Sequence, residues 1–335
     1  MTKKLTFLAG AVAGAALVAV PAVAGTVAPR ASGITPERIL HAQDTLTYTG
    51  LLLINGKQRV QVTHGGGHQK RQAFFGAKGE LADLVVSDGR IRWHYAPSQH
   101  LVRLMPLDEE VGIPRRLGLV NRNYRFQVMG QARKAGRLVV LTRFLPKHAG
   151  NMTHMLWVDP STYLPLAVER RAGDGRLIDR SEYLRIHYAP KLGVKAFQFS
   201  IPEGCKVQSF MTMLAHGDSK LTPPATLGFR PSVPKALPPG YSLMAWKYFS
   251  GNRNVPTFNW RFHDGLNSLS LFAVKERHQP PPPQDAKVLA LGDKQGFLAL
   301  HGANRMLMWK SGEVGYTLVG HVPEEEMLKV ARSTF

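Results

Sequence analysis

Cysteine is nearly absent from the sequence, because Cys205 is the only one among 335 residues. A single thiol cannot form a disulfide within the chain. An exported protein that is anchored through a lipid needs a cysteine at its new N-terminus, so we expect no such anchor here. We expect Cys205 itself to be a lone buried thiol without a catalytic role.

Long apolar runs are also scarce. The run Leu5–Val20 follows two lysines and precedes Ala22-Val23-Ala24, the small-x-small pattern that signal peptidase accepts. At about sixteen residues, the run is shorter than the roughly 20 that a spanning helix needs. The pattern predicts a signal peptide over residues 1–24, cleavage after Ala24, export to the periplasm, and a mature chain that does not span the membrane.

The sequence lacks the short motifs that signal catalysis or metal binding. It contains no Gly-x-Ser-x-Gly elbow, no phosphate-binding glycine loop and no His-Glu-x-x-His helix. His64 and His68 are separated only by glycines, which indicates a flexible hairpin tip and not a metal site. The acid cluster Asp108–Glu110 is typical of a solvated loop or helix start. We therefore expect no catalytic residues, no metal and no cofactor, although triads that assemble from distant residues remain open.

Acidic residues are few relative to basic ones: 43 Lys and Arg against 23 Asp and Glu give a formal net charge of +20. Removal of the two lysines of the predicted signal peptide lowers this charge to +18. Such an excess fits an acidic partner, which in an envelope means anionic lipid head groups, lipopolysaccharide phosphates or an acidic protein face. Predicted export makes nucleic acid an unsuitable partner. A solvated basic surface without a dedicated partner is the alternative.

What the sequence has in abundance is alternation of large apolar and polar residues, the period of a β-strand. Asn55-Gly56 and Asp88-Gly89 each separate two such stretches, which is the strongest short-range signal of a β-hairpin. The series continues to Ile201, and Thr35-Pro36-Glu37 predicts the start of a short helix ahead of it. Strands joined by tight turns form an antiparallel meander, one face of which needs a cover.

A change of composition divides the chain. Residues 203–235 are rich in proline and show little alternation, which predicts a linker between a first domain over 25–202 and a second over 236–335. In the second, Asp264-Gly265 marks a hairpin and Pro323 opens a final helix. We therefore predict a mainly β protein of the α+β class. A large, curved antiparallel half-barrel over short helices is followed by a smaller α+β domain.

The first domain has more large apolar residues than a thin core needs. Each of them would fit the core, but a curved sheet over short helices can also leave an apolar cavity for acyl chains or an apolar peptide. Basic side chains at its mouth would suit phosphorylated or carboxylated head groups. The candidates for lining such a cavity are Leu51, Leu53, Trp93, Tyr95, Phe126 and Trp157.

Several stretches resemble known families. "VSDGRIRWHYAPSQHLVR" and "LWVDPSTYLPLAVERRAGDGRLIDRSEYLRI" are similar to strand pairs of the lipoprotein-carrier fold of the LolA and LolB proteins. Further on, "LPPGYSLMAW", "FHDGLNSLSLFAVKE" and "YTLVGHVPEEEMLKVARS" occur in the order and spacing of the MucB/RseB family. Asp264, Gly265 and Leu266 match the hairpin motif of that family, whereas His263 and His321 replace its usual serine and glutamate.

The resemblance to the MucB/RseB family implies a periplasmic regulator of an envelope-stress, sigma-E-type sigma factor. Such a protein binds the periplasmic segment of a single-pass anti-sigma factor through its second domain and the groove between domains, and shields that segment from proteolysis. Its first domain would sense lipid or a lipopolysaccharide-type amphiphile and so weaken the binding. A periplasmic carrier of lipoproteins or lipids is the alternative. The partner-binding candidates are Trp246, Tyr248, Phe249, Asp264, Gly265 and Leu266, of which the three aromatic residues are also candidates for the core.

Overall fold

The computed structural model of the chain describes residues 33–107, 112–209, 213–217, 227–250, 255–301 and 304–335. The predicted signal peptide and the acid cluster Asp108–Glu110 lie outside these described residues. No helix in the described part is long and apolar enough to cross a membrane.

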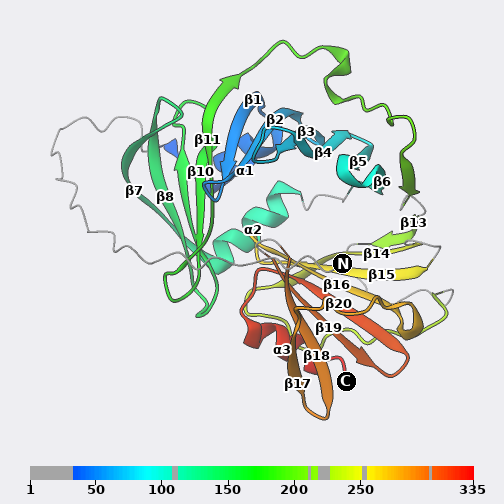
Figure 1. Ribbon diagram of the computed structural model, residues 1–335. Coiled ribbons are helices and arrows are strands. Elements are labelled where there is room, and N and C mark those ends of the chain that lie inside the picture. The colour runs from blue at the N-terminus through cyan, green and yellow to red at the C-terminus, as the bar shows by residue number, and fades with distance from the viewer. Residues whose placement is uncertain (1–32, 108–111, 210–212, 218–226, 251–254, 302–303) are drawn as a thin grey trace, which may run out of the picture.

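Twelve strands of the first part of the chain form one sheet, in the order β12-β6-β5-β4-β3-β2-β1-β11-β10-β9-β8-β7 (Figure 1). Neighbouring strands are antiparallel, except that β12 runs parallel to β6. Two helices, α1 (Pro36–Thr45) and α2 (Ile113–Asn123), pack against this sheet. The strands are β1 (Thr47–Ile54), β2 (Gln58–Gly66), β3 (Gln69–Phe75), β4 (Leu81–Asp88), β5 (Ile91–Ala96), β6 (Leu101–Pro106), β7 (Tyr124–Lys134), β8 (Arg137–Pro146), β9 (Thr153–Val158), β10 (Pro165–Arg171), β11 (Leu177–Tyr188) and β12 (Lys206–Ser209).

Local sequence explains the starts and turns of these elements. α1 begins after Thr35, whose Oγ1 accepts a hydrogen bond from the backbone N of Arg38 at 3.3 Å. Between β1 and β2, Asn55 and Gly56 adopt φ values of 50° and 69°, the left-handed pair that a two-residue hairpin turn requires. The hairpin predicted at Asp88-Gly89 joins β4 and β5 through a different turn, in which only Gly89 has a positive φ, of 100°, and Asp88 Oδ1 accepts from the backbone N of Arg90 at 2.8 Å. These sequence predictions are confirmed.

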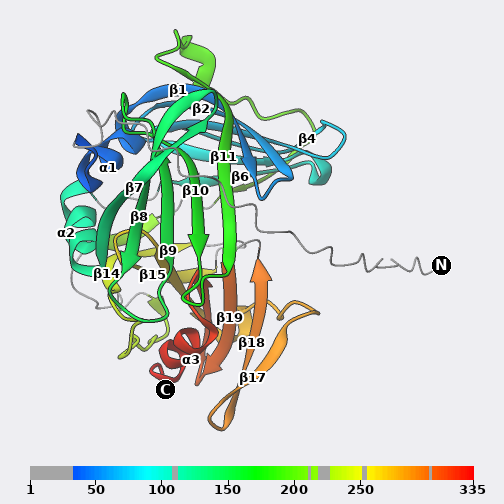
Figure 2. The same cartoon turned by 90° about the vertical axis from the view of Figure 1, so that its left-hand side faces the viewer.

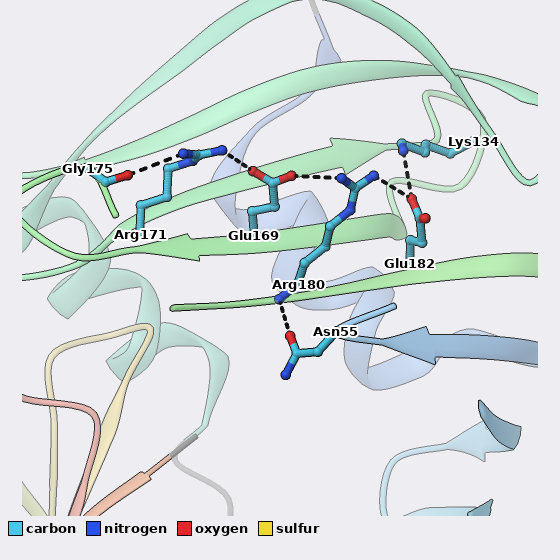
Figure 3. A network of polar contacts seen from close by, with 7 residues as sticks. All are labelled: Asn55, Lys134, Glu169, Arg171, Gly175, Arg180 and Glu182. Atoms are coloured by element: carbon cyan, nitrogen blue, oxygen red, sulfur yellow. Dashed lines mark hydrogen bonds and ion pairs between the residues drawn. The ribbon is translucent and has the colours of Figure 1, made fainter. Parts of the chain in front are cut away.

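The first sheet curls so far that two strands distant in its order come together. Lys134 of β7 donates from Nζ to Glu182 Oε2 of β11 at 2.7 Å, although β8, β9 and β10 lie between these strands in the sheet. Arg180 donates to the same Glu182 oxygen at 2.8 Å and lies 3.3 Å from Glu169 Oε1. Arg171 donates to Glu169 Oε2 at 2.8 Å, which completes the chain of ion pairs in Figure 3. This network fastens the curl of the sheet.

Eight strands form the second sheet, in the order β13-β14-β15-β16-β20-β19-β18-β17, with every pair antiparallel. The helix α3 (Glu324–Arg332) begins directly after Pro323, as predicted, and packs against β17 and β19 (Figure 2). The strands are β13 (Met213–Gly217), β14 (Ser242–Ser250), β15 (Pro256–His263), β16 (Ser268–Lys275), β17 (Lys287–Leu291), β18 (Lys294–His301), β19 (Asn304–Ser311) and β20 (Val314–Gly320).

The second sheet has its own aromatic core. Phe258 and Trp260 are fully buried, and their ring centroids lie 4.6 Å apart. Trp309 stacks on Tyr316 at 5.2 Å and donates its indole N–H to Thr334 Oγ1 at 2.9 Å. Because the C-terminal end of the chain supplies that acceptor, α3 is fixed to the sheet by a buried hydrogen bond as well as by apolar contact.

The predicted fold class, a mainly β protein with a curved antiparallel sheet over short helices, is confirmed. The segment 203–235, predicted as a linker, contributes β12 to the first sheet and β13 to the second. The proposed domain limits at 25–202 and 236–335 stay a prediction.

The network of Figure 3 leads to a stability prediction. Glu169→Gln removes a carboxylate whose side chain is 8 % exposed and which pairs with two arginines. We expect the free energy of unfolding to fall by about 1–3 kcal/mol, because hydrogen bonds to charged groups are lost. Urea titration followed by tryptophan fluorescence measures this. Glu325→Gln, at a side chain that is 79 % exposed, is the control and should change the value by less than about 0.5 kcal/mol. Equal effects of the two variants would contradict a role for the network.

Candidate functional site

A groove of about 470 Å³ lies where the two sheets meet. Strands β5 and β6 supply one wall and strands β14, β15 and β16 supply the other. Alternation along β14 decides which side chains face it: Lys247 and Phe249 line the groove, while Tyr248 is buried in the core of the second sheet. The lining residues are Arg92, Arg103, Met105, Lys247, Phe249, Asn259, Arg261, Ser268, Ser270 and Phe272.

The groove is basic on both walls. Arg92 and Arg103 come from the first sheet, Lys247 and Arg261 come from the second, and none of the described residues that line the groove is acidic. Lys247 also donates from Nζ to the carbonyl of Leu107 at 3.3 Å, which places its charge between the two sheets. With apolar side chains between the cations, such a groove suits a ligand that carries both carboxylates or phosphates and apolar groups.

An inner cavity of about 600 Å³ continues from this groove under α1. Arg92 and Met105 line both spaces, so they join them. The inner cavity is lined mainly by polar residues, which differs from the apolar cavity that the sequence predicts. Its lining residues are Gln43, Asp44, His64, Gly67, His68, Lys70, Gln72, Val85, Ser87, Arg92, His94, Met105, Leu107 and Arg116.

The histidines of the inner cavity have structural partners. His64 is stacked on Tyr48, and its Nδ1 lies 2.6 Å from the carbonyl oxygen of Leu46. His94 Nε2 lies 2.9 Å from Asp83 Oδ1. In the described part of the chain, no three His, Cys, Asp or Glu side chains gather closely enough to hold a metal ion.

The β15–β16 hairpin reaches out of the second sheet and inserts beside α2, which lies between the two sheets (Figure 1). We call its residues Asp264–Asn267 the hairpin tip. The Tyr124 hydroxyl of β7 donates to Asp264 Oδ2 at 2.6 Å, and the Asn123 amide donates to the Asp264 carbonyl at 2.7 Å. Asp264 is fully buried, and burial, with the Asp264 charge close by, raises the pKa of Tyr124 far above its usual value. Tyr124 is therefore a neutral, permanent donor to this carboxylate.

A third cavity of about 260 Å³ lies between α1, α2 and strands β8 to β11, and Leu266 of the hairpin tip forms part of its wall. The other apolar walls include Ile39, Val120 and Phe144. This cavity also has buried polar atoms without hydrogen-bond partners, namely Arg116 Nε, His154 Nε2 and Asp179 Oδ2, the last of which forms an ion pair with Arg170. We call it the hairpin cavity.

The six cavity candidates of the sequence line none of these three spaces. Trp93 and Tyr95 lie on the face of β5 opposite to the cavities, and their ring centroids are 6.2 and 6.0 Å from that of Phe199. Phe126 packs on Phe144 in the core under α1, Trp157 lies beneath the ammonium of Lys134, and Leu51 and Leu53 of β1 are partly exposed. The role of these six residues in ligand binding stays a prediction. The cavities are lined instead by the polar residues of β5, which alternate with Trp93 and Tyr95 in the sequence.

The partner-binding candidates are divided by the structure. Phe249 lines the groove, whereas Tyr248 is buried and Trp246 stacks on Phe258 at 5.5 Å. The hairpin tip, with Asp264, Gly265 and Leu266, contacts the first part of the chain and does not form a free surface. Sequence reasoning did not identify the four groove cations as a site, because their signal is only that each alternates with apolar neighbours on its strand.

Two histidines from different parts of the chain lie beside the hairpin cavity. Burial, with Arg170 and His321 close by, lowers the pKa of His154 to about 3. Burial and Arg170 lower the pKa of His321 to about 4, although Asp179, with Oδ2 3.9 Å from His321 Nε2, acts in the opposite direction. Both rings are therefore neutral near pH 7.

The histidine next to the hairpin tip is neutral as well. Burial, with Arg116 and Arg261 close by, lowers the pKa of His263 to about 4. Neutral His263 accepts a hydrogen bond at Nδ1 from the backbone N of Gly265 at 2.8 Å. Both departures from the family motif, His263 and His321, thus lie where the two sheets meet.

These histidines predict loss of stability in acid. Their pKa values in the folded chain are below the ordinary 6.5, so the unfolded chain binds more protons and stability falls as pH drops from about 6.5 through about 4. We expect His321→Gln to reduce the difference in unfolding free energy between pH 7 and pH 4.5 by on the order of 1–3 kcal/mol. Urea titrations at both pH values test this, with the exposed His278→Gln as control. An unchanged pH dependence in His321→Gln would refute this role.

Comparison with known proteins agrees with this architecture. The family model described as the MucB/RseB N-terminal domain matches residues 30–201. The solved complex of Pseudomonas aeruginosa MucA/MucB superposes with a TM-score of 0.57 at 19 % identity, covering 88 % of this chain and 95 % of that chain. The crystal structure of MucB superposes with a TM-score of 0.54 at 18 % identity, covering 88 % and 94 %. No curated protein matches the chain.

At these identities the solved structures establish the fold, and they extend over both sheets. The family model covers just over half of the chain. The protein therefore belongs to the MucB/RseB family, as the motifs in its sequence predict.

Proposed function

We propose that this protein is a periplasmic regulator of an envelope-stress, sigma-E-type sigma factor. In this proposal it binds the periplasmic segment of a single-pass anti-sigma factor and protects that segment from proteolysis. Membership of the MucB/RseB family supports the proposal, as does the solved complex of MucB with MucA among the structures with this fold. The protein acts by binding and has no chemistry of its own.

The observation that carries the proposal is the basic groove with walls from both sheets. Four cations and the apolar side chains Met105, Phe249 and Phe272 face one space. An extended acidic segment with apolar side chains fits this chemistry, since charges fix its register and apolar groups supply the burial. A groove of about 470 Å³ holds only a few side chains, whereas a stable interface buries about 800 Å² on each partner. The segment must therefore extend beyond the groove.

In the same proposal, the inner cavity and the hairpin cavity form the sensor. Lys70, Arg92 and Arg116 present cations in the inner cavity, which suits the phosphates or carboxylates of a lipid or a lipopolysaccharide-type amphiphile. A ligand that favours one arrangement of the sheets weakens a partner that favours another by its difference in affinity.

A periplasmic carrier of lipids or lipoproteins is the second candidate, because the inner cavity of about 600 Å³ is large enough for part of such a cargo. The groove favours the regulator, since a carrier has no need of a binding surface shared between the sheet that holds the cargo and a second sheet.

Affinity capture separates the two functions. The chain, with its predicted signal peptide and a C-terminal tag, is expressed in its own host, cross-linked mildly in the envelope and recovered, and everything retained is identified by mass spectrometry. We expect a single-pass protein encoded near a sigma factor to dominate. Recovery of lipoproteins or lipids without such a protein would favour the carrier and overturn the proposal.

The groove cations give a second prediction. With the captured segment as a synthetic peptide, Arg103→Glu combined with Arg261→Glu should weaken binding at least about tenfold, or about 1.4 kcal/mol. Binding to the unaltered protein should also weaken as salt is added. Isothermal titration calorimetry measures both effects. Arg176→Glu, at a turn where the side chain is 63 % exposed, makes a single charge reversal outside the groove and is the control. Equal affinities of both variants would exclude the groove as the binding site.

A further inference from the structure

The hairpin tip contacts the first part of the chain on a polar and an apolar side. On the polar side, Asp264 Oδ2 accepts from the Tyr124 hydroxyl at 2.6 Å, and the Asp264 carbonyl accepts from the Asn123 amide at 2.7 Å. On the apolar side, Leu266 packs against the core under α1 and closes part of the hairpin cavity. One turn of chain therefore joins the two sheets and also forms a cavity wall.

The hairpin cavity is too small for an amphiphile as it stands. Its volume of about 260 Å³ lies below the roughly 300–1,000 Å³ of pockets that hold drug-sized ligands. Ile39, Val120 and Phe144 belong to the core of the first sheet and are at most 2 % exposed. Leu266 is only partly buried and lies in the turn between β15 and β16 of the second sheet. The wall that can yield is therefore Leu266.

The polar lining of the hairpin cavity suits an anionic head group. Arg116 and Arg170 both reach it. Arg116 Nε is buried without a hydrogen-bond partner, although Nη1 of the same guanidinium lies 3.8 Å from Asp44 Oδ1. Arg170 is paired at 2.5 Å with Asp179, whose carboxylate also lines the cavity. A buried guanidinium donor left without an acceptor is unfavourable, and a carboxylate or phosphate would satisfy it.

The hairpin tip has to move as a unit. Asp264 Oδ1 accepts from the backbone N of Leu266 at 2.9 Å and of Asn267 at 2.7 Å, so these residues form one rigid turn. Gly265 has a φ of 109°, and a Cβ there would lie 2.6 Å from the backbone N of Val120, so the turn touches α2 directly. Withdrawal of Leu266 from the cavity must therefore also remove Asp264 from Tyr124.

We propose that the hairpin tip is an intramolecular plug of the hairpin cavity, and that an anionic amphiphile and this plug compete for the same space. Entry of the acyl chain expels Leu266, breaks the hydrogen bond between Asp264 and Tyr124, and releases the second sheet from α2. This inference rests on the proposed function, because it takes the amphiphile of that proposal as the ligand.

Expulsion of the plug also acts on the groove. The groove exists only while β5 and β6 face β14 to β16, and the hairpin tip lies at the end of β15 and the start of β16. Between the described residues, other contacts across this junction include hydrogen bonds to backbone carbonyls, from Arg115 to Leu243 and from Asn151 to Pro239, and the approach of His321 to Asp179. Water can replace such bonds at small cost. Loss of the plug therefore separates the two walls to which the partner binds.

The test uses the mature chain and a fluorescent fatty acid, dansyl-undecanoic acid, as the probe. Tyr124→Phe removes the hydroxyl that holds Asp264 but leaves the lining of the cavity intact. We expect it to bind the probe at least about fivefold more tightly, since the open state becomes more populated. Tyr316→Phe is the matched control, because it removes a buried hydroxyl that accepts from the backbone N of Ser232 at 2.6 Å, away from the hairpin. It should bind the probe as the unaltered chain does.

A second variant and a second measurement complete the test. Leu266→Ala removes the plug side chain without removing its backbone hydrogen bonds and should also bind the probe more tightly. Small-angle X-ray scattering should show a larger radius of gyration once the probe is bound. Equal probe affinities in all chains, no probe binding in Tyr124→Phe, or binding without a change in size would overturn the plug. The capture of an anti-sigma factor described above uses neither these variants nor the probe. Its outcome therefore tests the proposed function separately from the plug, so failure of one is distinguishable from failure of the other.

Discussion

The buried carboxylate of Asp264 is the interaction on which the relation between the two sheets depends. It is fully buried, and its two oxygens accept from the Tyr124 hydroxyl, the Asn267 amide and two backbone N–H groups of its own turn. A buried charge is tolerated only when its acceptor positions are occupied. The hairpin tip can therefore dock in one geometry, and that geometry also places Leu266 in the hairpin cavity.

In our proposal, docking of the hairpin tip brings basic residues of the two sheets together at the groove. The groove has cations from both sheets, which the hairpin tip joins, and the inner cavity shares Arg92 with the groove. The formal charge of the protein is +20, and part of this charge lies at the groove. In our proposal, the shape of the groove depends on the hairpin tip. In the proposed function, an acidic protein segment favours the docked arrangement, whereas a ligand large enough to expel Leu266 favours the undocked one. Linkage then requires each to weaken the other.

Features set by neighbouring residues could be predicted from the sequence. The turn at Asn55-Gly56, the helix start at Thr35 and the hairpin at Asp264-Gly265 each depend on residues within a few positions. The alternation on β14 also predicts that Lys247 and Phe249 share a face. Pairings over long separations could not be predicted. The parallel strand β12, the curl that brings β7 to β11, and the contact of Tyr124 with Asp264 across 140 residues all depend on how complete elements pack.

The residues that line the candidate site could not be predicted from the sequence either. Large apolar residues such as Trp93 and Tyr95 suggest a cavity, but a strand has two faces and the sequence does not say which one meets the helices. In the structure these rings pack against Phe199, while Arg92 and His94 of the same strand face the cavities. The match to the family indicates partner binding for the hairpin motif, and that role stays a prediction. In the structure the carboxylate of this motif accepts from Tyr124 of the same chain.

The most direct test of the coupling is a complete linkage cycle with the captured anti-sigma segment and dansyl-undecanoic acid. The affinity of the mature chain for the segment is measured with and without saturating probe, and the affinity for the probe is measured with and without saturating segment. We predict that each ligand weakens binding of the other by the same factor, within the roughly 5- to 150-fold range of typical couplings. Unchanged affinity for the segment while the probe is bound would contradict it.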